Sequence, residues 1–221
     1  MRKILLLILA LPKSFVFNLK YFPLSVAMKL PVLVSHRVWL KQLSGTVTLD
    51  KSSFGSVLIG FNDVGIFDKV KSRSIWEVSG EVNFRGRAKI GHGSKLSVSG
   101  ILDVGDGFVI TAESSIIANK HVKIGENVLV SWEVLIMDTD FHPIYCHDEH
   151  INPDMKIEIG QNVWIGCRCI ILKGSVIPDG NVIGAGTTVS NEIEVTSSIL
   201  LGVPLRVVKS GITWSSHAHR E

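Results

Sequence analysis

The sequence is short of cysteine, of aromatic side chains and of charge, and each shortage argues against a class of protein. Its three cysteines, Cys146, Cys167 and Cys169, are an odd number without framework spacing, which argues against a disulfide-stapled secreted domain and favours a reducing cytoplasm. Aromatic residues make up 7% of the chain against 20 glycines, a balance that suits a turn-rich β architecture within one domain. The net charge of only +3 gives no reason to expect nucleic acid.

The N-terminus lacks an uninterrupted apolar run of membrane-spanning length. Arg2 and Lys3 precede an eight-residue apolar run from Ile4 to Leu11, whereas a spanning helix needs about 20 residues. The run stops at Pro12-Lys13, and no small-x-small site follows closely, which argues against a cleaved signal peptide. We expect a packed helix or a shallow membrane-surface contact through residues 1–30.

The chain does have a repeat with a period of six residues. From residue 159 onward every sixth position is a branched aliphatic: Ile159, Ile165, Ile171, Ile177, Ile183, Val189, Val195, Leu201 and Val207. Shorter blocks upstream keep the same period: Val78, Phe84 and Ile90, then Val98, Val104 and Ile110, then Ala118, Ile124, Val130 and Ile136. Helical stripes recur near 3.6 residues, so a period of six instead indicates one short strand plus a corner. Because such a unit cannot bury its own apolar face, the repeat predicts stacked parallel coils.

Units of the form Ile/Val-Gly-x-x-x-x, such as Ile159-Gly160-Gln161-Asn162, are similar to the hexapeptide repeats of the left-handed β-helix acyltransferases. The C-terminal coils, which include Gly184-Ala185-Gly186 and Gly202-Val203-Pro204, resemble the galactoside, maltose and polysaccharide O-acetyltransferases. The resemblance implies an all-β fold, a left-handed parallel β-helix, with a short N-terminal helical or irregular segment and a loop inserted at 137–158. The expected domains are an apolar or helical appendage at 1–45, the acyltransferase domain at 46–209, and a tail at 210–221.

The repeat is interrupted between Ile136 and Ile159 by 22 residues that hold three of the eight histidines and six of the twenty acids. Loops of this length in compact domains are usually functional or disordered. Acyl transfer from a thioester to an alcohol needs a base, and histidine, with a pKa near about 6.5, suits neutral pH. Phe141-His142-Pro143 resembles the family's catalytic step, so we expect His142 to be the base, with Asp138, Asp140 or a backbone carbonyl orienting its imidazole.

The resemblance also implies residues that contact acetyl-CoA and the acceptor. The expected cofactor-binding residues are Cys167 and Ala185 beside the pantetheine, Ser190 and Asn191 where the family commonly has Thr-Lys, and Arg206 and Lys209 at two basic positions. Asn191 lacks the family's positive charge, and Lys173 is a candidate replacement. Asn119 and Asp140 are the candidate contacts to the acceptor.

The resulting hypothesis is an acetyl-CoA-dependent O-acetyltransferase that acts on a sugar hydroxyl in surface-polysaccharide or glycan biosynthesis, as a cytoplasmic homotrimer. N-acylation of an amino-sugar nucleotide is an alternative, because an amine acceptor needs the same base. A zinc hydratase is another alternative, because His142 and His147 have suitable spacing, but neither His92 nor His121 falls where a third ligand is expected. We therefore expect no metal. A covalent role for Cys167 or Cys169 would need a group that lowers the thiol pKa.

Overall fold

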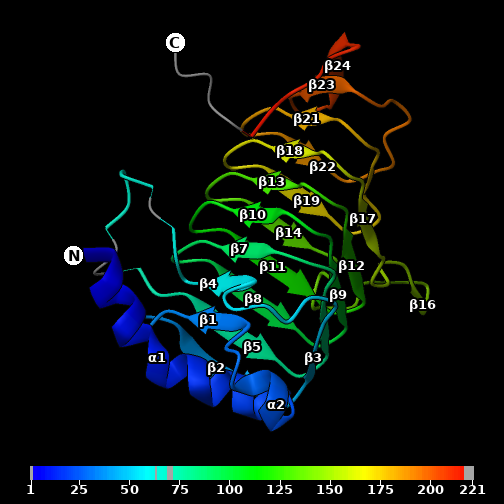
Figure 1. Cartoon of the computed structure of the whole chain (residues 1–221). Coiled ribbons are helices and arrows are strands. Elements are labelled where there is room, and N and C mark those ends of the chain that lie inside the picture. The colour runs from blue at the N-terminus through cyan, green and yellow to red at the C-terminus, as the bar shows by residue number, and fades with distance from the viewer. Residues whose placement is uncertain (1, 63, 69–71, 217–221) are drawn as a thin grey trace, which may run out of the picture.

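The computed structural model describes residues 2–62, 64–68 and 72–216, and most of them form a stack of short strands wound into three sheets (Figure 1). We call these sheets A, B and C; they are the three faces of a triangular prism. Every named pair of strands within them is parallel except the last pair of sheet A, β23 and β24. The parallel β-helix that the repeat predicts is thus confirmed.

The strands of each sheet follow one another in chain order along the prism. Sheet A contains β1 (Val32–Val34), β4 (Val57–Ile59), β7 (Ala88–Ile90), β10 (Phe108–Ile110), β13 (Leu129–Val130), β18 (Trp164–Ile165), β21 (Val182–Ile183), β23 (Ser198–Leu201) and β24 (Arg206–Ser210). Sheet B contains β2 (Trp39–Leu43), β5 (Ile75–Val78), β8 (Lys95–Val98), β11 (Ser115–Ala118), β14 (Leu135–Met137), β19 (Ile170–Leu172) and β22 (Thr188–Val189). Sheet C contains β3 (Thr46–Leu49), β6 (Glu81–Phe84), β9 (Ile101–Val104), β12 (His121–Ile124), β17 (Ile157–Ile159) and β20 (Val176–Ile177).

Coil length changes along the stack. In the first half, Ile75 pairs with Lys95 and Lys95 with Ser115, a step of 20 residues. In the second half Ile170 pairs with Thr188, a step of 18, or three units of six. The extra two residues form turns that stack closely, since a Cβ on Gly100 would lie 2.4 Å from the carbonyl oxygen of the next turn. In the sequence, each upstream block of repeat positions begins eight residues after the last one ends instead of six, and these turns account for the difference.

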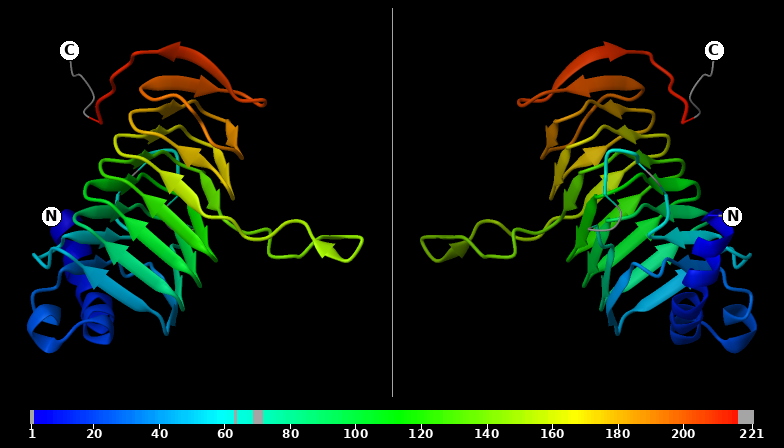
Figure 2. Two further views of the ribbon diagram at one scale, coloured as in Figure 1. Left: turned by 90° about the vertical axis from the view of Figure 1, so that its right-hand side faces the viewer. Right: turned by 90° about the vertical axis from the view of Figure 1, so that its left-hand side faces the viewer.

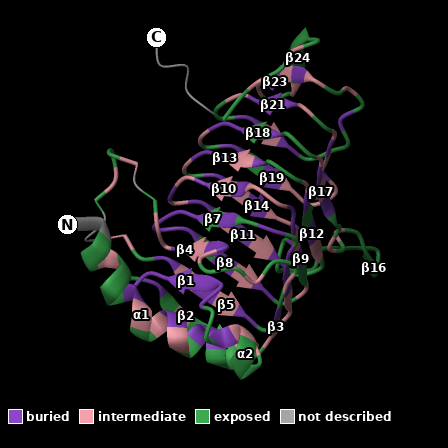
Figure 3. Ribbon diagram, viewed as in Figure 1, coloured by how far each residue is buried: buried purple, intermediate pink, exposed green. Residues whose placement is uncertain are grey.

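The core is a column of buried apolar side chains inside the prism. Figure 3 colours the buried residues purple. All ten upstream repeat positions from Val78 to Ile136, and the six from Ile159 to Val189, are at most 2% exposed. Side chains at every second strand position point inward, so these residues form continuous stacks of contact between coils. This packing gives the prism one uninterrupted hydrophobic core.

The six-residue frame fails after Val189, contrary to the prediction. Leu201 and Val207 are 46% and 49% exposed, and the buried residue is Leu200, which pairs with Ile183 at a step of 17. The chain between these two strands is one residue shorter than the repeat, so the inward position moves back by one. β24 then runs antiparallel along β23 and ends the stack.

The N-terminal segment is helical, and it differs from expectation only in where the β-helix begins. The helix α1 (Arg2–Tyr21) runs through Pro12, where the apolar run of the sequence stops, and a short helix α2 (Leu24–Ala27) follows it. A proline inside a helix costs about 3 kcal/mol, and the cost is offset by packing of the following turns, where Phe17 is completely buried against the first coils. The parallel sheets begin at Val32 rather than near the expected boundary of 46. The last part of the expected tail, 217–221, lies outside the described residues.

Candidate active site

An arm leaves the prism at the edge between sheets B and C, between β14 and β17, and projects far from the coils (Figure 2). We use the name arm for residues 138–156. It ends in an antiparallel hairpin of β15 (Tyr145–Cys146) and β16 (Glu149–His150). The two residues at its tip, His147 and Asp148, both have positive φ, of 48° and 66°, as a tight two-residue hairpin turn requires. His147 therefore lies in the turn at the tip of the arm, whereas His142 lies before β15, nearer to the prism.

His142 lies on the outgoing limb of the arm, and its side chain is exposed to solvent. Its backbone is held at both polar atoms: the N–H donates to the carbonyl oxygen of Asp140 at 2.7 Å, and the carbonyl accepts from Asn152 Nδ2 at 3.0 Å. A fixed backbone with an exposed imidazole presents a proton acceptor to whatever molecule occupies the outer side of this edge.

Asn152 joins the two limbs of the arm. Its amide nitrogen also donates to Asp140 Oδ2 at 2.9 Å, and its amide oxygen accepts from the Ile144 N–H at 2.5 Å. Lys173 Nζ, which comes from the next coil, donates to Asp140 Oδ2 at 2.5 Å and to the Asn152 carbonyl at 2.8 Å. Sequence reasoning missed Asn152, because nothing in the repeat or the loop composition distinguishes it.

These contacts place the Asp140 carboxylate and the Lys173 ammonium together at the base of the arm. Hydrogen bonds from Lys173 and from Asn152 lower the pKa of Asp140 below its ordinary value, so the carboxylate stays charged at neutral pH. The Lys173 ammonium is engaged at the base of the arm, which contradicts its proposed use as a phosphate contact in place of Asn191. Asp140 contacts the arm's own anchor, and its use as an acceptor contact remains a prediction.

A second anchor holds the returning limb. Asp154 Oδ2 accepts from Asn119 Nδ2 at 2.5 Å, and its backbone carbonyl accepts from Lys120 Nζ at 3.0 Å. A hydrogen bond from Thr139 is the largest cause that lowers the pKa of Asp154. Asn119, the other candidate acceptor contact, therefore lies at the same edge as His142 and is bonded to the arm. These residues form one connected base beneath the outgoing and returning chains.

The Asp138 carboxylate bonds the backbone of a neighbouring coil rather than the imidazole of His142. Its carboxylate is completely buried and accepts three backbone N–H groups, those of Asn119 at 2.7 Å, Lys120 at 2.9 Å and His121 at 2.7 Å. Asp138 is therefore committed to the turn between β11 and β12, and the suggestion that it orients His142 is wrong.

Replacing Lys173 with methionine is expected to loosen the arm and lower the free energy of unfolding by about 1 kcal/mol, the upper range for a partly exposed ion pair. Because the folded-state pKa of Asp140 is depressed, its contribution is present above the unfolded value near about 4 and is lost as pH falls through the lowered pKa. Urea titrations of both proteins should therefore differ at pH 7 and converge in acid. Lys156→Met removes a more exposed pair with Glu158 and is the matched control. A pH-independent difference would contradict the assignment.

The expected pantetheine residues lie on a different edge of the prism, between sheets A and B. Cys167 and Ala185 occupy successive coils there, and the Gly186 N–H donates to the Cys167 carbonyl at 2.9 Å. Cys167 is half-buried and Ala185 is exposed, so both can contact a molecule that lies along the corner. One chain therefore carries His142 on one edge and these two residues on another.

The remaining candidates lie near the C-terminal end of the prism. Ser190 and Asn191 follow β22 at the B–C edge and are exposed. Arg206 and Lys209 lie on β24 and are also exposed, as phosphate-binding residues must be. The structure thus distributes the predicted cofactor contacts over two edges and the terminal strand, and their binding role stays a prediction.

The two rival chemistries of the sequence analysis have identifiable places in the structure. Burial raises the pKa of the Cys169 thiol, which donates to the Gly184 carbonyl at 3.0 Å, so it is held as the unreactive thiol form. His121 lies on sheet C, where its Nε2 is 2.8 Å from Asp103 Oδ2. Within the described ranges, no group of three or more histidine, cysteine or acidic side chains is arranged to hold a metal ion.

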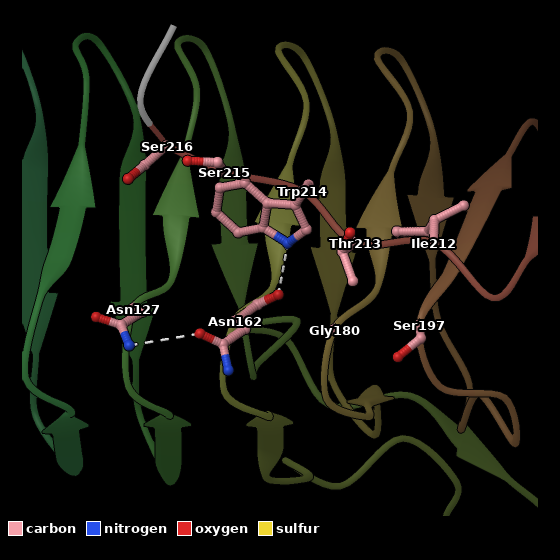
Figure 4. Close-up of a pocket in the computed structure, with 9 residues that line it drawn as sticks. All are labelled: Asn127, Asn162, Gly180, Ser197, Ile212, Thr213, Trp214, Ser215 and Ser216. Atoms are coloured by element: carbon pink, nitrogen blue, oxygen red, sulfur yellow. Dashed lines mark hydrogen bonds between the residues drawn. The ribbon is translucent and has the colours of Figure 1, made fainter. Parts of the chain in front are cut away.

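A cavity of about 410 Å³ lies along the third edge, between sheets C and A (Figure 4). The C-terminal segment folds back over the corner turns there, and Trp214 Nε1 donates to the Asn162 carbonyl at 2.6 Å. The lining consists of Asn127, Asn162, Gly180, Ser197, Ile212, Thr213, Trp214, Ser215 and Ser216. Because these side chains supply no acid or base, the cavity is not the place for proton transfer.

Comparison with known proteins agrees with this architecture. Residues 156–191 match the family model described as bacterial transferase hexapeptide (six repeats). The crystal structure of the polySia-specific acetyltransferase NeuO superposes with a TM-score of 0.59 and 23% identity, covering 80% of this chain and 81% of that one. Both comparisons agree with a parallel β-helix built from hexapeptide repeats, in the left-handed form that the resemblance implies.

Two curated relatives extend the likeness to sequence. Galactoside O-acetyltransferase of Escherichia coli (strain K12) is 36% identical over 111 residues, which are 49% of this chain and 53% of that protein. The putative lipopolysaccharide biosynthesis O-acetyl transferase WbbJ of the same strain is 29% identical over 143 residues, 59% of this chain and 72% of that protein. The chain thus spans about half the length of the first relative. The resemblance to the hexapeptide-repeat acyltransferases is confirmed.

Proposed function

We propose that this protein is an acetyl-CoA-dependent O-acetyltransferase that modifies a sugar hydroxyl of a glycan or a surface-polysaccharide precursor. The observation that carries the proposal is the arm: it projects from a transferase-type β-helix, and it presents the exposed imidazole of His142 from a backbone fixed by Asp140 and Asn152. Two relatives that match the chain over the repeat are named for O-acetyl transfer to a galactoside and in lipopolysaccharide biosynthesis.

The proposed reaction moves one proton from the acceptor hydroxyl to the CoA thiolate by way of His142, and it needs no metal. The imidazole of His142 takes the proton of the acceptor hydroxyl while the hydroxyl oxygen attacks the thioester carbonyl. The tetrahedral intermediate collapses with cleavage of the carbon–sulfur bond, and the imidazolium returns the proton to the departing CoA thiolate. The products are an acetyl ester and free CoA. Holding donor and acceptor beside one base accounts for much of the rate by proximity.

The donor is proposed to lie along a coil edge that carries Cys167 and Ala185, where small side chains leave room for the pantetheine. Arg206 and Lys209 are the cations offered to its phosphates, since charge-assisted hydrogen bonds are the strongest contacts to phosphate oxygens. Ser190 and Asn191 can add neutral hydrogen bonds. Asn119 and Asp140 flank the base on the acceptor side.

The proposed active enzyme is a homotrimer, in which the arm of one copy reaches the donor edge of the next. The exposed apolar side chains of the arm support this: Phe141, Ile144, Tyr145, Ile151 and Met155 are 63%, 52%, 63%, 54% and 49% exposed. An apolar patch of this kind on a projecting hairpin is typical of a protein interface. The cysteines, all three free thiols, suit a reducing compartment, so we place the enzyme in the cytoplasm.

The function can be tested by incubating the purified full chain with acetyl-CoA and three sets of acceptors: oligosaccharides, polysaccharide repeat units and amino-sugar nucleotides. We expect release of CoA thiol with a hydroxyl acceptor and a product whose acetyl group is removed by mild alkali, because an ester is cleaved under conditions that leave an amide intact. An alkali-resistant product formed only from amino-sugar nucleotides would establish N-acylation instead. Absence of thiol release with every acceptor, together with tightly bound zinc, would favour the hydratase.

A further inference from the structure

The N-terminal helix α1 has one face that is committed to the β-helix. Ser14 Oγ accepts from the Val34 N–H at 2.9 Å, and Asn18 bonds both polar backbone atoms of Val32, at 3.2 and 2.7 Å. These bonds occupy backbone N–H and C=O groups of β1, the first strand of sheet A. Without them, the outer edge of this strand would be free to pair with another chain. The buried face of α1 therefore closes the N-terminal end of the prism, as Figure 1 shows.

The opposite face of α1 is apolar and exposed (Figure 3). Leu5, Ile8, Val16 and Leu19 are 56%, 56%, 56% and 53% exposed, and their spacing of 3, 8 and 3 residues places them on one side of the helix. We use the name apolar stripe for these residues together with Leu9 of α1, Leu24 at the start of α2 and Met28 just after it, which are 45%, 66% and 60% exposed. Single exposed apolar residues are normal on soluble proteins, but several exposed apolar side chains gathered on one face indicate a binding surface.

The charge around the apolar stripe has one sign. The first 49 residues contain seven of the 23 lysines and arginines and none of the 20 acidic residues, although the whole chain carries only +3. Lys20 and Lys29 are exposed beside the stripe. Apolar residues flanked by lysines are the features of a helix that lies in a membrane interface, where the cations meet anionic headgroups.

The helix has the length and composition of a membrane-spanning segment over Ile4–Tyr21, but its contacts fix it differently. The Phe17 ring lies 5.0 Å from that of Trp76, and Lys13 Nζ donates to the His36 carbonyl at 2.6 Å. A spanning orientation would require all these contacts and the bonds to β1 to break, and would expose polar backbone atoms of the sheet. An orientation in the plane of the membrane keeps every one of them.

We propose that the apolar stripe docks this protein on a bilayer that contains anionic phospholipid, with α1 lying parallel to the membrane surface. The prism then stands on its N-terminal end, with β24 at the far end and the arm projecting from the side at intermediate height (Figures 1 and 2). This inference does not rest on the proposed catalytic function, and lipid binding is measured without acetyl-CoA.

The test is flotation of the full chain with vesicles of phosphatidylcholine, with and without about one third phosphatidylglycerol. The wild-type protein should float with the anionic vesicles, less with neutral ones, and less at high salt, since salt screens the lysines. Ile8→Glu combined with Val16→Glu should lower the partition coefficient at least about tenfold, because two carboxylates then face the acyl region. Lys20→Glu combined with Lys29→Glu should remove the preference for anionic vesicles.

Val208→Glu is the matched control, because Val208 is 62% exposed on β24 at the opposite end of the prism, and its flotation should equal that of the wild type. Circular dichroism should show that each variant keeps its β signal, since the altered side chains point away from the core. The proposal is overturned if the wild type does not float or if Ile8→Glu with Val16→Glu floats equally well. It is also overturned if the glutamate substitutions change the oligomeric state of the protein and leave its binding to vesicles unchanged. Resistance of vesicle-bound protein to extraction by alkaline carbonate, as shown by a spanning helix, would overturn it as well.

Discussion

His142→Ala is expected to lower kcat for acetyl transfer by about 10²- to 10⁴-fold, the range typical of a missing general base. The KM for acetyl-CoA should change by less than about twofold, because the imidazole acts on the acceptor proton and not on the phosphates or the pantetheine. The fold should be unaffected, since the His142 side chain is exposed and the anchoring hydrogen bonds of this residue use its backbone.

The measurement is the initial rate of CoA thiol release at saturating donor and acceptor. His142→Gln keeps a polar side chain of similar size without a basic nitrogen and should lose as much kcat as the alanine variant. His150→Ala is the matched control, because His150 is an exposed histidine of the same arm whose ring contacts Tyr145 at 5.5 Å. A His142→Ala enzyme with wild-type kcat would exclude the imidazole as the base, whatever its effect on KM.

The core of the β-helix could be predicted from sequence because each coil repeats the same local requirement. Val104, Ile124 and Ile159 are buried at matching positions of sheet C, paired one above another. The prediction needed only the period and the rule that one coil buries its apolar side chain against the next. Leu200 shows the limit of that reasoning: a single residue missing before β23 moved the inward position, and both neighbours in the sequence are aliphatic.

The anchors of the arm could not be predicted in the same way. Lys173 and Asp140 are 33 residues apart, and Asn119 and Asp154 are 35 apart, and none of them occupies a repeated position. Their contacts depend on where the inserted chain turns back, which the periodicity of the coils does not determine. The exposed position of His142 could be anticipated, whereas the network that holds its backbone required the three-dimensional structure.

The extent of α1 could not be derived from the sequence for a related reason. Pro12 is a helix-stopping signal on local grounds, yet Ser14 and Asn18 beyond it bond the backbone of β1. These long-range bonds need the helix to continue, and they exist only once the first coil of the prism has formed. The contacts between α1 and β1 therefore outweigh the local preference of Pro12 to end the helix.

Asp138→Ala should have the largest effect on stability, a loss of about 3 to 5 kcal/mol in the free energy of unfolding. The variant leaves three backbone N–H groups, those of Asn119, Lys120 and His121, without the buried carboxylate that accepts them. Each buried N–H group left without an acceptor costs about 1 to 3 kcal/mol, and the shared partner makes the sum less than additive. The check is a urea titration followed by circular dichroism, with the exposed Glu149→Ala of the same arm as control.

The same substitution should also reduce activity, which separates a role in positioning from simple loss of folded protein. Asp138 begins the arm, and the turn that it holds contains Asn119, which bonds Asp154 on the returning limb. If the turn relaxes, the base of the arm shifts and carries His142 with it, and a displacement near about 1 Å can cost on the order of a hundredfold in rate. Measured at low temperature, where the variant stays folded, kcat should fall by at least about tenfold. An unchanged urea midpoint would contradict the structural role, and an unchanged kcat in the folded variant would show that the arm is positioned without this turn.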